Sequence, residues 1–460
     1  MKYPRAQQLA WTLLIVLFGQ IAMLAAPALA DDTVACGQTP PTDPKQPYKA
    51  DLFGDLGGVR PAIGQYGLTF ALSETSEILG NPTGGTHRGA IYEGLTDASL
   101  ALNLRSYFNW PGVFCIRAYQ IHGRGLSTHN INNLMTVSSI EATPTTRLLE
   151  LWYEQWIDDW LRIRIGQQGA DQDFIISPTA RLFVNSTFGW PSLPSSDLPS
   201  GGPAYPLSTP GVRVHVKVNG AVSFFAGLFN SDPAGPGPGD PQKRDASGTA
   251  FRINDGAFAL FEARYRPGET DDSAIYKIGA WFNSEKFADQ HFDSNGVSLA
   301  SPLSNGMPRL LGNDYSFYGI IDQPLFQAED GTGLAIFARA MGAPGDRNLV
   351  SFYFDTGFAY QKPFGRDGDQ VGIGFAYARI GNSARLLDQD KAAFTGTAFP
   401  VRSRESVIEV TYQAQVTDWW QLQPDFQYIT APSGGILNPN GSGRKIGDAA
   451  VFGLRSTISF

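Results

Sequence analysis

Hydrogen-bond acceptors and donors gather around one indole in the first half of the chain. Glu150, Trp152 and Glu154 alternate along one stretch, and Arg162 and Arg164 alternate along the next. Two-residue spacing places each set on one face of an extended strand. Carboxylate acceptors, guanidinium donors and an aromatic face together can bind a neutral, hydroxylated solute that has an apolar ring face. These residues are therefore candidates for a polar binding path.

More polar residues come just before this group. Arg105 and Arg117 lie on the preceding predicted hairpin and could form a basic side of the path, while His122 and Arg124 lie where that hairpin ends. If Arg117 faces inward, strict alternation sends His122 and Arg124 outward, unless a bulge intervenes. Both arrangements stay open. For His122, a structural hydrogen bond is the simpler explanation.

Catalytic and cofactor patterns are missing from the sequence. There is no Gly-x-Ser-x-Gly elbow, and the paired acids Asp158 and Asp159 fall in a short turn, where adjacent side chains point apart. No Cys/His spacing indicates a metal site, and no glycine-rich phosphate loop joins a strand to a helix. We therefore expect neither an enzyme, nor a metal, nor a cofactor.

The elements that must position the candidates are strands. Alternation of apolar with polar or charged residues recurs almost to the end of the chain. The clearest stretches are 99–108, 149–156, 161–165, 212–218, 261–266, 276–283, 408–413 and 421–428. Their second face carries charged, amide and aromatic side chains, which favours a wide aqueous lumen over a packed core.

The spacing of these strands predicts a closed membrane barrel. Long segments (192–210, 232–245, 284–309, 381–404 and 433–447) contrast with short ones such as 416–419. Long loops at one end and short turns at the other are typical of transmembrane β-barrels. We expect an all-β, antiparallel transmembrane barrel of about 16 strands over residues 67–460. No apolar run after the first thirty residues is long enough for a membrane helix.

The N-terminal residues predict export. Lys2 and Arg5 precede an apolar run, and Ala28-Leu29-Ala30 resembles a cleavage site, so residues 1–30 read as a signal peptide. Residues 31–66 are expected to form a periplasmic segment with a short helix within 51–65. The formal net charge of −8 disfavours nucleic-acid binding. Of the two cysteines, Cys36 and Cys115, a disulfide and two free thiols are both open in an oxidising compartment.

The last residues agree with a barrel. Phe452, Leu454, Ile458 and Phe460 share one face of a final predicted strand that ends on an aromatic residue. A closed barrel needs its last strand to pair with its first, because an open edge in hydrocarbon leaves backbone groups unsatisfied. A terminal aromatic resembles the signal read by the outer-membrane assembly machinery, so Phe460 is expected to contact that partner.

Several candidates also have structural explanations. Glu150 and Arg162 could neutralise each other across neighbouring strands. Trp152 could belong to an interfacial aromatic belt, although its carboxylate neighbours favour the lumen. The other tryptophans near predicted strand ends or turns are expected in such belts: Trp110, Trp156, Trp160, Trp190, Trp419 and Trp420.

Longer strings of residues resemble the carbohydrate-selective porin family, the OprB-like family named for the glucose porin of pseudomonads. The resemblance runs from about Leu52 to Phe460 and is least distinct over 232–404. It is carried by residues 52–60 (LFGDLGGVR), 120–126 (QIHGRGL), 146–155 (TRLLELWYEQ), 185–191 (NSTFGWP), 197–205 (DLPSGGPAY), 408–415 (IEVTYQAQ) and 422–428 (LQPDFQY).

The resemblance implies a porin of the Gram-negative outer membrane that passes glucose and similar sugars by diffusion. Its partners would be monosaccharides or small oligosaccharides, outer-membrane lipid and, in a homotrimer, further copies of the chain. Two alternatives stay open. One is a barrel for other small polar or aromatic solutes, and the other is a secreted, soluble β-protein that binds polysaccharide.

Overall fold

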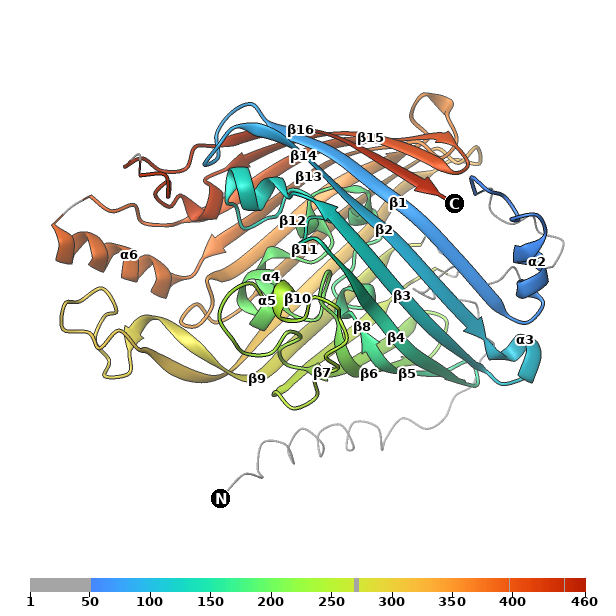
Figure 1. The fold of residues 1–460 in the computed structure, drawn as a ribbon, viewed down its shortest axis with the longest axis horizontal. Helices are drawn as coiled ribbons and strands as arrows, with labels where there is room; N and C mark the ends of the chain where they lie inside the picture. The colour runs from blue at the N-terminus through green and yellow to red at the C-terminus, as the bar shows by residue number, and fades with distance from the viewer. Residues whose placement is uncertain (1–50, 269–272, 397, 442) are drawn as a thin grey trace, which may run out of the picture.

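A closed β-barrel forms the body of the protein in the computed structural model (Figure 1). The structure describes residues 51–460 except 269–272, 397 and 442, so the predicted signal peptide and Cys36 lie outside the described residues. Sixteen antiparallel strands pair in chain order, and the first pairs with the last, which confirms the predicted fold and strand number. The strands are β1 (Leu68–Asn81), β2 (Gly89–Asn103), β3 (Gly112–Gly123), β4 (Thr145–Ile157), β5 (Leu161–Gln168), β6 (Thr209–Lys217), β7 (Val222–Asn230), β8 (Ala257–Tyr265), β9 (Ile275–Asp293), β10 (Pro308–Gln327), β11 (Gly333–Gly342), β12 (Val350–Gln361), β13 (Gln370–Ile380), β14 (Arg404–Thr417), β15 (Trp420–Thr430) and β16 (Ala449–Ser459).

The described helices are short and lie in the segments before or between the strands. They are α2 (Val59–Gly64), α3 (Leu104–Phe108), α4 (Ser192–Asp197), α5 (Pro241–Arg244) and α6 (Asn382–Thr395). In the described part of the chain, no helix is long and apolar enough to cross a membrane. The helix α2 falls within residues 51–65, where a short helix is expected.

Two predicted boundaries were wrong. The alternating stretch 99–108 ends as a strand at Asn103, because the Asn103 side chain caps α3 by accepting from the backbone N–H of Arg105 at 3.0 Å. The predicted loop 284–309 is shorter than expected, since β9 extends to Asp293 and β10 begins at Pro308, which leaves only 294–307 between them. In the first case a cap ends the alternating strand early, and in the second the strands extend into the predicted loop.

The strand connections differ at the two ends of the barrel. At the end that carries α3, the connections are mostly short, such as 158–160, 218–221 and 418–419. At the other end they include 124–144, 169–208, 231–256 and 381–403. We call these the short-turn end and the long-loop end.

Apolar side chains cover the outer wall and polar ones face inward. On β9, Ile278 is 69% exposed while Asn283 is fully buried, and on β10 Phe317 is 67% exposed while Asp314 is fully buried. The seam between β1 and β16 is closed by ladder bonds and by the ion pair of Glu77 with Arg455. Such a wall satisfies its backbone groups and presents hydrocarbon outward, as a lipid bilayer requires.

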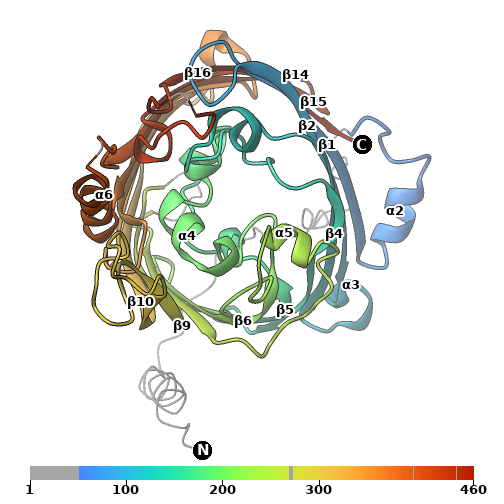
Figure 2. The same ribbon diagram turned by 60° about the vertical axis from the view of Figure 1, so that its left-hand side comes forward.

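The interior is less open than predicted. Figure 2 shows the segment that carries α4 inside the ring of strands. We call residues 169–208 the inward loop. Its apolar residues, including Phe174, Phe188 and Leu193, pack against lumen-facing residues such as Phe258 and Phe337. The expectation of a wide aqueous lumen therefore needs correction, because a hydrophobic core fills part of the barrel.

Candidate functional site

Two carboxylates and two guanidinium groups meet where the inward loop approaches β4, β5 and β6. The Glu154 carboxylate lies 2.9 Å from Arg164 Nε and 2.7 Å from Arg213 Nη2. The Asp173 carboxylate lies 3.0 Å from Arg164 Nη1 and 3.3 Å from Arg213 Nε. We call these four residues the ion quartet. Its charges balance, so it forms a rigid set of donors and acceptors between the loop and the wall.

The Asp173 carboxylate stays ionised because of its neighbours. Burial opposes its ionisation, but Arg213, Arg164 and Arg264 outweigh burial and lower the pKa of Asp173 to about 2. Asp173 is therefore ionised over the whole physiological pH range.

The Trp152 ring stacks against one arginine of the ion quartet. The Arg164 guanidinium lies 4.1 Å from the centre of the Trp152 ring, and Trp152 is only 2% exposed. Gly166 faces Trp152 across the ladder with φ +138, and a Cβ there would lie 2.6 Å from the Trp152 Cα. Trp152 thus faces the interior, but it positions Arg164 and offers little surface of its own.

Arg117 and Glu150 both face inward. This agrees with the arrangement that sends His122 and Arg124 outward. The pair of Arg117 with Glu150 continues the regular register of Cys115 with Trp152, and a bulge in β4 follows it: the next residue of β3 pairs with Leu148, so Leu149 also points inward and is buried. Arg117 binds Asp97 at 2.6 Å and lies 3.9 Å from Glu150.

The proposed cross-strand neutralisation of Glu150 by Arg162 was wrong. Arg162 pairs in register with Trp156, and its guanidinium lies 5.6 Å from the Trp156 ring. Cys115 is buried opposite Trp152. Because Cys36 lies outside the described residues, the disulfide stays a prediction.

Three predicted lumen residues lie elsewhere. His122 is on the outer face, where its ring nitrogens lie 3.0 Å from Tyr92 Oη and 2.9 Å from Gln120 Oε1. Arg124 is exposed just beyond β3, and Arg105 is exposed in α3. Parity explains His122 and Arg124, because with Arg117 inward the even-numbered positions along β3 point out. Arg105 is displaced because β2 ends at Asn103 and α3 begins. Two predicted belt tryptophans are also exceptions: Trp190 is buried in the inward loop, and Trp156 packs beside the inward-facing Trp152 and donates to Glu154 at 2.9 Å.

Wall carboxylates hold the loops that enter the barrel. Glu409 accepts the backbone N–H groups of Val184 at 2.6 Å and Asn185 at 3.0 Å. Glu405 does the same for Leu134 and Met135 of the loop 124–144, at 2.8 and 2.7 Å. Because these N–H groups are buried, the carboxylates satisfy donors that would otherwise be costly.

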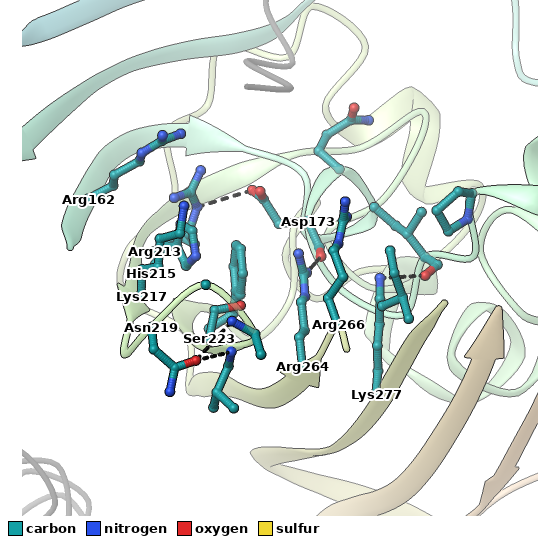
Figure 3. A pocket seen from close by; sticks show the side chains of 18 of the residues that line it. Arg162, Asp173, Arg213, His215, Lys217, Asn219, Ser223, Arg264, Arg266 and Lys277 are labelled. Atoms are coloured by element: carbon teal, nitrogen blue, oxygen red, sulfur yellow. Dashed lines mark hydrogen bonds and ion pairs between the residues drawn. The ribbon is translucent and has the colours of Figure 1, made fainter. Parts of the chain in front are cut away.

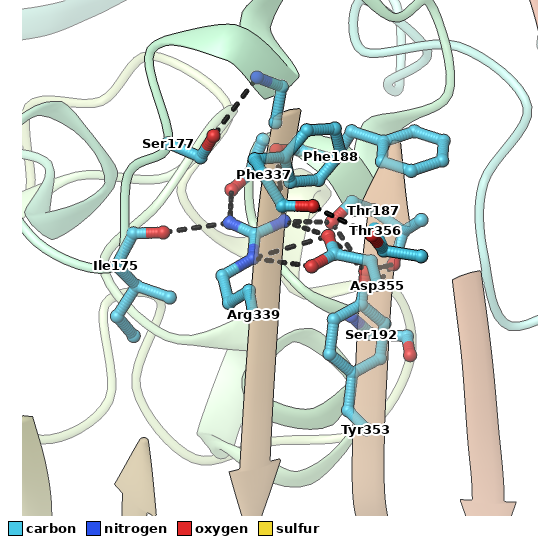
Figure 4. Close-up of polar contacts among 12 residues, drawn as sticks. Ile175, Ser177, Thr187, Phe188, Ser192, Phe337, Arg339, Tyr353, Asp355 and Thr356 are labelled. Carbon is cyan, nitrogen blue, oxygen red and sulfur yellow. Dashed lines mark hydrogen bonds and ion pairs between the residues drawn. The ribbon is translucent and has the colours of Figure 1, made fainter. Parts of the chain in front are cut away.

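Arg339 holds the inward loop from the opposite side (Figure 4). Its guanidinium donates to the carbonyl oxygens of Ile175 at 2.7 Å and of Thr187, Phe188 and Gly189 at 3.0 Å each. It also pairs with Asp355, and both side chains are fully buried. The loop is therefore fixed at several points across the barrel and narrows it.

A cavity of about 600 Å³ remains between the inward loop and the wall of β5 to β9. Inward-facing positions on β5, β6, β8 and β9, or directly after β8, point cations into it (Figure 3). We call the following wall residues the cation stripe: Arg162, Lys217, Arg264, Arg266 and Lys277.

Most of this cavity was missed as a site from the sequence. Of its polar residues, only Glu154, Arg162 and Arg164 were among the candidates. Arg213 and Lys217 share one face of an alternating stretch, and so do Arg264 and Arg266. Both patterns are visible in the sequence. Following the two-residue alternation from each strand to the next would have placed these four side chains on the same, inward face of the barrel. Asp173 could not have been found in this way, since it lies in a loop without periodicity.

Comparison with known proteins identifies this architecture. The family model for "Carbohydrate-selective porin, OprB family" matches residues 87–460. The chain belongs to this family. It is accordingly a non-enzymatic outer-membrane channel, and the alternative of a secreted soluble protein is wrong.

Individual relatives agree with this family membership. Porin B of Pseudomonas aeruginosa is 25% identical over 414 residues, which cover 83% of this chain and 87% of that protein. The high-pH structure of Pseudomonas putida OprB has a TM-score of 0.79 at 23% identity and covers 90% of this chain and 99% of that one. The low-pH structure of the same protein has a TM-score of 0.53 at 19% identity and covers 89% and 98%.

Family membership orients the porin. In outer-membrane barrels, short turns face the periplasm and long loops face the outside. The cation stripe, which includes the last residue of β6 and the residue after β8, therefore lies toward the periplasmic mouth. The inward loop enters from the extracellular side.

Proposed function

We propose that this porin passes glucose and similar small sugars by passive diffusion along the space between the inward loop and the wall of β4 to β9. The observation that carries this proposal is the ion quartet, a fixed array of donors and acceptors in a narrowed part of the barrel. Such an array can replace water on sugar hydroxyls while the solute passes. Family membership supports the same solute class.

The contacts must be weak for transport, because a tightly held solute would block the channel. The quartet suits this requirement, since its charges are already paired with one another at 2.7 to 3.3 Å. A sugar hydroxyl would therefore meet charged groups whose hydrogen-bonding capacity is already partly used. Trp152 and Arg117 have positioning roles in this proposal.

The test is conductance of the purified porin in planar bilayers while glucose, maltose or sucrose is added. We expect glucose to reduce the current in a concentration-dependent way and to permeate liposomes faster than triethylene glycol, a solute of similar mass with fewer hydroxyls. Equal rates for these two solutes would indicate a general pore. Absence of conductance would contradict a channel.

A matched pair of variants tests the path. Trp152→Ala removes the ring beneath Arg164, so we expect weaker block by glucose. Trp160→Ala removes an exposed tryptophan near the same turn and should leave the block unchanged. Heat-modifiable gel migration, the sign of a folded barrel, should persist in both variants. Its loss in Trp152→Ala would show a structural role instead.

A further inference from the structure

A polar cluster lies on the outer face of the barrel, where β1, β2 and β3 run side by side (Figure 1). Its residues alternate along their strands with buried, inward-facing residues such as Glu77 and Glu93, so they point away from the lumen. We call the following six residues the wall network: Glu74, Ser76, Tyr92, Thr96, Gln120 and His122. The proposed sugar path uses none of them.

Glu74 holds one side of the wall network. Its carboxylate accepts from Thr96 Oγ1 at 2.6 Å and from Ser76 Oγ at 3.2 Å, and it lies 3.5 Å from His122 Nε2. Gly94 makes room for both larger side chains, because a Cβ at this position would lie 2.3 Å from His122 Nε2 and 3.0 Å from Glu74 Oε1. The carboxylate and the imidazole therefore lie close against the wall.

The amide of Gln120 is the least satisfied group of the wall network. Its Oε1 lies 2.9 Å from His122 Nδ1 and 3.5 Å from Thr96 Oγ1. Its Nε2 makes no hydrogen bond to any of the residues that the structure describes, and the side chain is exposed on the outer face. An amide NH₂ group has two donors, and hydrocarbon cannot accept from either of them.

The wall network lies at mid-height of the barrel wall. Glu74 is the seventh of the 14 residues of β1, and Thr96 is the eighth of the 15 residues of β2. The apolar band of an outer-membrane barrel is about 25 Å tall, so the middle of a strand falls well inside it. Lipid headgroups lie outside this band, and lipid tails neither donate nor accept hydrogen bonds.

The opposite side of the barrel shows the usual lipid-facing pattern. Strands β9 and β10 lie across the ring from β1 and β2 (Figure 2). These strands and their neighbour β12 present large apolar side chains outward, including Ile278, Phe282, Phe317, Ile321 and Phe352. The wall of β1 to β3 departs from this pattern at the depth where polar groups are most costly in lipid.

We propose that the wall network is the contact face for a second copy of this porin, related to the first by a two-fold axis. A two-fold contact brings the same surface of both copies together, so a face with both donors and acceptors is complementary to itself. The Glu74 carboxylate and the Tyr92 hydroxyl supply acceptors, and the Gln120 amide supplies donors. Ala98 and Ala118 pair beside the network, and such small outward residues allow two walls to approach closely.

A closed ring of three copies would instead bring two different faces of each copy together. The self-complementary network therefore favours a pair over the homotrimer that the family resemblance implies. The contact is independent of the proposed function, because every residue of the wall network faces away from the lumen.

Cysteine cross-linking in outer membranes tests this contact. Ala98→Cys places a thiol beside the wall network, and Ala338→Cys places one on the outer face of β11, on the other side of the ring. Wild type, whose Cys115 is buried, is the blank. Under mild oxidation we expect a two-copy band with Ala98→Cys and none with Ala338→Cys, because thiols held in a contact react at a high effective concentration. Sedimentation of wild type in mild detergent should give the mass of two copies.

A second set of variants removes the polar groups. Gln120→Leu/His122→Leu makes this part of the wall apolar, as lipid requires, so the barrel should keep its heat-modifiable gel migration. In the Ala98→Cys background we expect this change to abolish the two-copy band. Gln323→Leu removes an amide from the outer face of β10, where Gln323 accepts from Tyr276 Oη at 2.6 Å, and should leave the band unchanged. If the double variant does not fold, Gln120→Leu alone serves in its place.

Several outcomes would overturn the proposal. Bands of equal strength at both walls would show random collision, and a wild-type mass of one or three copies would exclude a pair. A band that joins Ala98→Cys to a different protein would show another partner, and persistence of the two-copy band in a folded Gln120→Leu/His122→Leu variant would show that the network does not form the contact. Glucose block should be the same in this variant as in wild type, so a failure of the proposed function would appear separately, as absence of block in wild type.

Discussion

At the scale of single residues, the interior is organised by buried charges whose partners come from distant parts of the chain. Arg339 reaches four carbonyl groups of the inward loop and pairs with Asp355. Glu154 and Asp173 lie 19 positions apart and share the same two arginines. A buried charge is tolerated only when it is paired and hydrogen-bonded, so each of these residues depends on the exact position of the loop.

Arg339→Met should destabilise the folded porin. It leaves the Asp355 carboxylate buried without its ionic partner, a change that typically costs about 3–5 kcal/mol. The measurement is urea unfolding in detergent, followed by the heat-modifiable gel shift. The double variant Arg339→Met/Asp355→Leu removes both charges and should recover part of the stability. If the single variant were as stable as wild type, Arg339 would not be anchoring the loop.

The pH response of the quartet follows from Asp173. Its folded pKa, about 2, is below the value of about 3.9 for an unfolded aspartate. Its stabilising contribution is therefore present above pH 4 and is lost as the pH falls through 2. We expect glucose block to stay constant from pH 8 to pH 4 and to weaken only below that. A titration of this block near pH 6 would contradict the assignment, and Asp173→Asn provides the control.

At the scale of elements, the inward loop decides what the barrel contains. Its apolar residues pack on the wall of β8 to β12, and its polar residues face the cavity beside β5 to β9. Glu405 and Glu409, from a single strand, hold two different loops by their backbone N–H groups. The strand β14 thus serves as an anchor for both.

Glu409→Gln should loosen this anchor. The amide retains one acceptor oxygen and adds an NH₂ group that cannot accept from the two N–H donors of Val184 and Asn185. We expect faster hydrogen exchange at these two amides and more frequent current fluctuations. Gln413→Glu is the control, because Gln413 lies four residues further along β14 and away from these amides. Unchanged exchange at Val184 and Asn185 would show that packing alone holds the loop.

At the scale of the whole molecule, the barrel has two unlike ends. Long loops gather at one end, including the one with α6, and short turns at the other (Figure 1). The inward loop narrows the barrel from the first end, and the cation stripe faces the second. A solute entering from outside would therefore meet the loops first and the positive wall last.

This polarity predicts the orientation in the cell. An epitope placed in the loop 381–403 should bind antibody on intact cells, because long loops face outward. The same epitope in the turn 328–332 should bind only after the outer membrane is permeabilised. Reversed accessibility would place the cation stripe at the outer mouth and would change the order of events proposed for transport.

The sequence by itself determined the barrel, its approximate strand number and the inward direction of Glu150, Trp152, Glu154 and Arg164. It could do so because lipid on one side and a polar interior on the other impose a two-residue period on every strand. That period is local and can be read from one stretch at a time.

Only the tertiary structure decided the bulge in β4, the outward position of His122, the cap that ends β2 and the filling of the barrel by the inward loop. Each depends on contacts between segments far apart in the chain, such as Asp173 with Arg213 or Ile175 with Arg339. An aperiodic loop leaves no local signal of where it will lie, because its position is set by the wall carboxylates and guanidinium groups that satisfy its backbone.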